Sequence, residues 1–76
     1  MKTVTYNIYS IEYNESGERF RKFLEKATIE KETEILFLIE KGYLNPEDIA
    51  YVEIVETESG INIISSENVL IFVLEY

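Results

Sequence analysis

The chain contains no cysteine and no histidine. Without cysteine it cannot form a disulfide, use a thiolate nucleophile or bind zinc or an iron–sulfur cluster through thiolates. Without histidine it lacks the commonest general base and the commonest metal ligand. These two absences exclude large classes of redox, metal-dependent and histidine-dependent enzymes, and we expect the protein to need no cofactor.

Long apolar runs are absent too. The longest, Ile35–Ile39 and Val69–Leu74, are far shorter than the roughly 20 residues that a membrane-spanning helix needs. The first seven residues alternate polar and apolar side chains, unlike the continuous apolar core of a signal peptide. We therefore expect a soluble, cytoplasmic protein with no membrane partner.

Basic residues are missing from one half of the chain. Residues 1–41 hold all seven basic side chains and eight acidic ones, a net charge of −1, whereas residues 42–76 hold seven acidic side chains and no lysine or arginine, a net charge of −7. These carboxylates could serve solubility alone, or they could attract a cationic partner, because net charge is evidence about partners and solubility rather than about fold.

What is present suits one small folded domain. The 76 residues are 46% hydrophobic and 13% aromatic, which is enough to fill a single core and leaves no length for a second. Residues 3–13 are rich in β-branched and tyrosine side chains and predict a strand. Its apolar face changes phase near Ile8 and Tyr9, which indicates either a bulge or a strand that is apolar on both faces.

The next segment has helical spacing. Phe20, Phe23, Leu24 and Ala27 follow the i, i+3, i+4, i+7 pattern, so residues 16–41 are predicted to form either one kinked helix or two helices. The apolar run in the second part predicts a well-buried helix that ends at Gly42.

The remainder predicts a sheet. Asn45–Asp48 is typical of a short helical turn, and residues 50–55, 61–65 and 69–74 read as a three-stranded antiparallel meander. The last strand is apolar on both faces, so it should lie inside the sheet and pair with the first strand. The expected fold class is α+β: a two-layer β-α(α)-β-β-β domain with a four-stranded, mainly antiparallel sheet and the helices on one face. The predicted core includes Phe23, Leu38, Ile54 and Phe72.

No catalytic motif emerges. Ser65 and Ser66 fall in a predicted turn with no histidine to act as a base, and 14 glutamates must bring some carboxylates together by chance. Acidic residues at the start of the second predicted helix would repel phosphates, so we expect no direct binding of nucleic acid. We predict that the protein is not an enzyme.

Surface residues are then the candidates for function. Tyr51 and Val55, with the carboxylates of Glu53, Glu56, Glu58 and Glu67, could form an apolar patch rimmed by acids. The leading hypothesis is a non-catalytic acidic module that docks on a basic surface of a larger partner. A phage-type inhibitor or nucleic-acid mimic that targets a nucleic-acid-binding enzyme is one example. The alternative is a homo-oligomeric accessory domain, such as a homodimer, that associates through an open sheet face or a strand edge.

Overall fold

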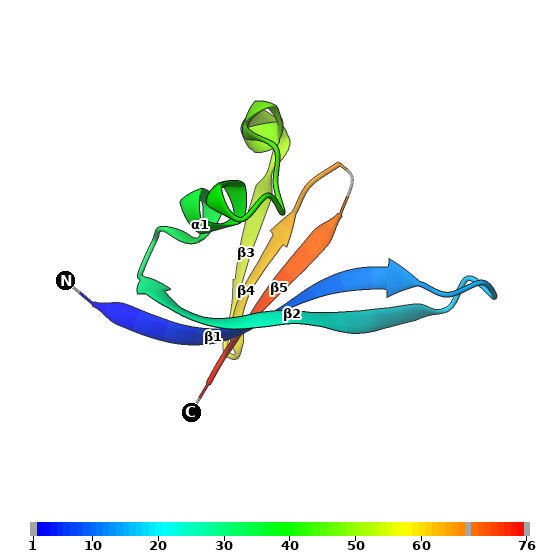
Figure 1. Cartoon of the computed structure of the whole chain (residues 1–76), viewed down its shortest axis with the longest axis horizontal. Helices are drawn as coiled ribbons and strands as arrows, with labels where there is room; N and C mark the ends of the chain where they lie inside the picture. Colours follow the sequence, from blue (N-terminus) through cyan, green and yellow to red (C-terminus); the bar gives the residue numbers. More distant parts are fainter. Residues whose placement is uncertain (1, 67, 76) are drawn as a thin grey trace.

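The computed structural model describes residues 2–66 and 68–75 and has an α+β fold (Figure 1). One antiparallel sheet contains five strands in the order β2-β1-β5-β4-β3. The α+β class and the antiparallel sheet are confirmed, whereas the strand count of four is wrong. Among the described residues, no helix is long and apolar enough to cross a membrane.

The additional strand is β2 (Arg19–Glu30), which occupies most of the segment predicted to be helical. It pairs with β1 (Thr3–Tyr13) along its whole length, from Thr3 opposite Glu30 to Tyr13 opposite Arg19. The register shifts between Ile8 and Tyr9, so the predicted bulge is confirmed, with Leu24 as the extra residue on β2. This bulge explains why the segment was predicted to be helical. It lets Leu24 and Ala27, which are three residues apart, both pack against the core, and a spacing of three is typical of one face of a helix.

A tight turn joins β1 to β2 where we expected a helix to begin. The side-chain carbonyl of Asn14 accepts hydrogen bonds from the backbone N–H groups of Ser16 and Glu18, and Gly17 adopts a positive φ of 80°. Because β1 pairs with β5 only between Tyr6 and Ser10, the ends of β1 and β2 extend past the sheet as a two-stranded arm (Figure 1).

The helix α1 (Glu34–Glu40) is much shorter than predicted, but its C-terminal end is where the sequence placed it. Gly42 has a φ of 80°, and the N–H groups of Gly42 and Tyr43 bond back to the carbonyls of Ile39 and Leu38. The helix lies over one face of the sheet and buries Leu38 completely. A 3-10 helix, η1 (Pro46–Tyr51), follows, as the Asn-Pro pair predicted.

The predicted three-stranded antiparallel meander is confirmed as β3 (Glu53–Thr57), β4 (Gly60–Ile64) and β5 (Val69–Leu74). Its first strand begins three residues later than predicted, because η1 extends to Tyr51. β5 is the central strand of the sheet and pairs with β1, as expected. The β3–β4 turn requires glycine at position 60, because φ is 152° and a Cβ there would collide with the carbonyl oxygen of Phe72.

The core lies between α1 and the covered face of the sheet. Its buried residues are Tyr6, Ile8, Leu38, Leu44, Ile63, Leu70 and Phe72. The Phe72 ring makes edge-to-face contacts with Tyr6 and Phe37, at centroid distances of 5.1 and 6.5 Å. Leu38 and Phe72 are therefore confirmed as core. Phe23 and Ile54 are not core, since they are 53% and 54% exposed on the two edge strands of the sheet.

Candidate functional site

The surface feature best suited to binding is the edge strand β3. It forms one border of the sheet, it pairs with β4 alone, and all five of its residues are exposed. In an antiparallel pair, alternate residues turn their N–H and C=O groups away from the neighbouring strand, so the outer side of β3 presents unpaired backbone groups. Such an edge can accept a further strand.

The residues of β3 divide between the two faces of the sheet, because successive side chains point to opposite faces. Ile54 and Glu56 lie opposite Ile63 and Ile61, on the face that α1 covers in part. Glu53 and Val55 lie on the other face, which we call the open face.

The structure brings only part of the predicted patch together. Glu53, Glu56 and Val55 are all on β3, and Glu58 follows them in the β3–β4 turn. Tyr51 is 75% exposed, but it ends η1 and is not in the strand. Glu67 lies outside the described residues. The predicted patch is thus an acidic strand edge with side chains on both faces.

Charge compensation differs between the two halves of the domain. In β2, Glu25 accepts a hydrogen bond from the Tyr43 hydroxyl at 2.6 Å and lies 3.8 Å from the Lys41 ammonium. Glu53 and Glu56, in contrast, have no basic side chain of residues 2–66 or 68–75 within 4.0 Å. The carboxylates of Glu53 and Glu56 are therefore in no ion pair with a described residue, unlike that of Glu25.

A hollow lies beside Glu56 at the covered face. This pocket, of about 300 Å³, is lined by Tyr6, Lys2, Lys31 and Glu56, among others. Burial raises the pKa of Tyr6, and the nearby carboxylates of Glu34 and Glu56 raise it further. A phenol with a raised pKa stays protonated at neutral pH, so Tyr6 is not a base.

Over residues 2–66 and 68–75, no group of three or more acidic side chains is arranged to hold a metal ion. Ser65 is engaged in the β4–β5 turn, where its hydroxyl donates to the carbonyl of Asn68 and accepts from the N–H of the same residue.

A second surface feature, which the sequence pattern did not predict, is the basic and aromatic side of β2. Phe23 packs edge-to-face on Tyr9 at 5.5 Å, and the guanidinium of Arg21 lies over the same Tyr9 ring at 6.0 Å. Polar and apolar residues do not alternate over residues 19–23, so the only available signal for a strand was the alternation over residues 26–30.

Comparisons with protein-family models, with curated proteins and with solved structures each found no significant match. The function is therefore argued from the geometry of this chain.

Proposed function

We propose that the chain is a non-catalytic protein-binding module that docks through its acidic edge strand β3 on a basic segment of a larger partner. One observation carries the proposal: β3 is an exposed edge strand whose carboxylates, Glu53 and Glu56, form no ion pair within 4.0 Å with a described residue.

The mode of binding follows from the free edge. An extended segment that pairs with β3 gains main-chain hydrogen bonds, while its alternating side chains meet those of β3 on each face. A lysine or arginine on either face of that segment would lie next to Glu53 or Glu56. Ile54 and Val55 add exposed apolar surface between the two charges. Charge would then select the partner and the backbone would hold it.

This arrangement favours edge docking over mimicry of a nucleic-acid backbone. A mimic needs its carboxylates in line on one surface, whereas the pleat of β3 sends Glu53 and Glu56 to opposite faces. An inhibitor of a nucleic-acid enzyme remains one member of the proposed class, provided that its target offers a basic strand.

Synthetic peptides test the proposal directly. A short peptide of alternating lysine and valine should shift the backbone amide resonances of β3 in an NMR titration, and the affinity should fall as salt rises. A peptide of alternating glutamate and valine is the negative control and should not bind. The double variant Glu53→Lys/Glu56→Lys should no longer bind the lysine peptide. The control variant Glu15→Lys/Glu18→Lys, in the β1–β2 turn, should bind it as the unmodified protein does.

Two outcomes would contradict the proposal. Resonance shifts that avoid β3 would show that the peptide binds elsewhere. Equal binding of the lysine and glutamate peptides would show that the carboxylates select nothing.

A further inference from the structure

The open face of the sheet is basic along one edge, apolar in the middle and acidic along the other edge. Directly opposed residues of antiparallel strands share a face, so the strand register gives the composition of this face. One row across it, from β2 to β3, consists of Phe23, Tyr9, Ile71, Asn62 and Val55.

The next row has a charge at each end. Arg21 lies opposite Ile11 on the arm, and Val69, Ile64 and Glu53 are opposed in turn on β5, β4 and β3. Ile11 and Val69 each lie one residue beyond the last β1–β5 pair, Ser10 and Leu70, where the two strands separate, and both line the same hollow. Arg21 and Glu53 are therefore at the two ends of a line of three aliphatic side chains that is interrupted between β1 and β5.

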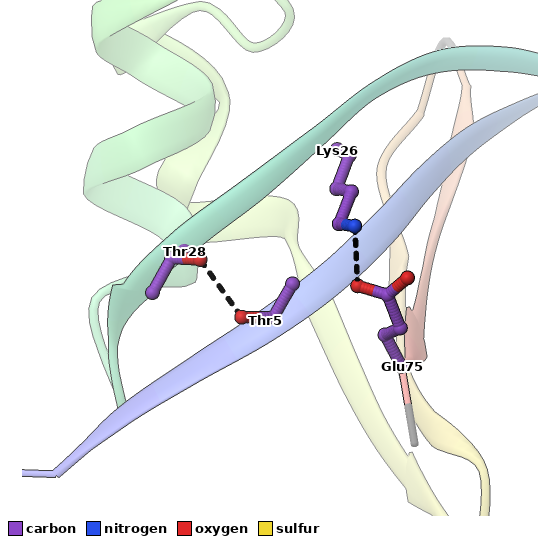
Figure 2. Close-up of polar contacts among 4 residues, drawn as sticks. All are labelled: Thr5, Lys26, Thr28 and Glu75. Carbon is purple, nitrogen blue, oxygen red and sulfur yellow. Dashed lines mark hydrogen bonds and ion pairs between the residues drawn. The ribbon is translucent and has the colours of Figure 1, made fainter.

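The arginines of this face are not neutralised nearby. Lys26, on the same face of β2, lies 2.8 Å from the carboxylate of Glu75 (Figure 2). Arg19 and Arg21 lie in no ion pair with a residue of 2–66 or 68–75. The β2 edge thus keeps a positive charge in a chain whose net charge is −8.

The apolar surface that remains exposed is also at the two edges. Ile71 and Ile11, in the middle, are only 6% and 8% exposed, so neighbours already shield them. Phe23 on β2 and Val55 on β3 are 53% and 37% exposed. A partner for this face must therefore offer a small apolar group over Phe23, an acid over Arg21 and a base over Glu53.

A second copy of the chain meets all three requirements. A two-fold axis parallel to the strands and passing over β5 places β2 of one sheet above β3 of the other. Arg21 then faces Glu53 of the second copy, and Phe23 faces its Val55, twice over by symmetry. We propose that the protein forms a homodimer by this face-to-face packing of the open faces.

Other arrangements satisfy the surface less well. A two-fold axis across the strands would stack β2 on β2 and oppose arginine to arginine. The phosphates of a nucleic acid would be attracted by the arginines of β2 but repelled by the carboxylates at the opposite edge. The charge pattern therefore selects the first dimer.

The size of the face limits the strength of the dimer. Five strands about 4.8 Å apart and a few residues along each strand give a contact of at most roughly 500 Å² on each copy, because the side chains in the middle are already buried. The total of at most roughly 1,000 Å² lies at the lower limit for a specific interface. We expect a dimer that dissociates on dilution and weakens with salt, because its charge pairs lie at the rim.

Sedimentation of the purified chain over a range of concentrations, compared with four single variants and one double variant, tests the dimer. Arg21→Glu and Glu53→Arg should each weaken self-association by at least about tenfold, since each opposes like charges. The double variant should restore it, because the two charges are then exchanged. Lys22→Glu and Glu56→Arg are matched controls on the same strands but on the covered face, and they should leave the dimer intact.

A second measurement locates the contact in the unmodified protein. In a mixture of isotopically labelled and unlabelled chains, an intermolecular NOE should connect the Phe23 ring to the Val55 methyl groups. Within one copy these residues are four strand spacings apart, about 19 Å, so the signal can only arise between copies.

The dimer is refuted by a monomeric mass at all concentrations, by loss of dimer in the controls, or by a dimer that neither charge reversal affects. Both experiments use the chain alone, so their failure is distinct from the failure of peptide docking at β3.

Discussion

Phe72→Ala is the sharpest test of the core. Phe72 is 1% exposed at the centre of β5, and its ring packs edge-to-face on both Tyr6 and Phe37. Removing a buried phenylalanine ring costs about 3–5 kcal/mol, through lost transfer free energy and the cavity left behind. A domain of this length has a free energy of unfolding of about 4–11 kcal/mol, so the variant should lose about a quarter or more of its stability.

Phe23→Ala is the matched comparison, because a strand and a helix over residues 19–30 predict different costs for this substitution. In β2 the ring is 53% exposed and contacts Tyr9. About half of a surface of roughly 200 Å² is buried, so truncation should cost about 1–2 kcal/mol. In an amphipathic helix over the same residues, Phe23 would be a core residue and would cost as much as Phe72.

Urea unfolding followed by circular dichroism measures both variants. The expected result is a lower midpoint for Phe72→Ala than for Phe23→Ala at a similar m-value, with a difference of about 1–4 kcal/mol. Equal destabilisation by the two substitutions would refute the assignment of β2 as an exposed edge strand.

Three further substitutions test the packing, one turn and the linkage to pH. Leu38→Ala should cost about 3 kcal/mol, while Leu36→Ala, at a site 62% exposed on the same helix, should cost under about 1 kcal/mol; similar costs in urea would mean that α1 is rotated. Gly60→Ala should lower stability by more than about 1 kcal/mol, because the new Cβ meets a β5 carbonyl; an unchanged melting temperature would contradict this turn. The hydrogen bond to Glu25 raises the pKa of Tyr43 above its usual 10.0, so the stabilising effect of the bond is complete below pH 10.0 and disappears as the pH rises through the raised pKa. Tyr43→Phe should therefore lose less stability than the wild type on going to alkaline pH, and identical profiles would show that the bond does not contribute.

The sequence predicted the C-terminal half of the fold well because its signals are local and agree with one another. Val69–Leu74 is apolar on both faces, which suits only a central strand, and β5 is the middle strand of five. The turn at Glu58–Gly60 and the helix end at Gly42 depend on glycine conformations that few other residues adopt.

Residues 19–30 could not be assigned in the same way because their structure depends on a distant partner. Arg, Lys, Glu, Leu and Ala favour helix locally, yet pairing with β1 satisfies the backbone of the whole segment. The bulge at Leu24 then disrupts the period of two that would have indicated a strand. Once this segment becomes a strand, Phe23 moves from the core to the surface.

The candidate site was only partly predictable for a related reason. The excess of acids after Gly42 is visible in the sequence and appears in the structure as the carboxylates of β3. The strand register decides which carboxylates share a face of the sheet. A register shift of one residue would move Glu53 to the covered face and Glu56 to the open face. The opposed charges of Arg21 and Glu53 depend on the order of all five strands, which no local pattern contains.

The two proposed surfaces share Glu53 and Val55, but the dimer uses the side chains of the open face, whereas docking depends on the outer backbone groups of β3 and on Glu56 at the covered face. Pairing of β2 of one copy with β3 of another, edge to edge, would join opposite charges but would repeat without closing and give a fibre. The bulge in the β1–β2 pair disfavours this, since it twists the β2 edge away from a flat partner. Packing of the open faces instead closes after two copies and uses side chains, so the outer backbone groups of each β3 stay free. Such a dimer presents two acidic edges, one at each side, and can engage two basic segments at once.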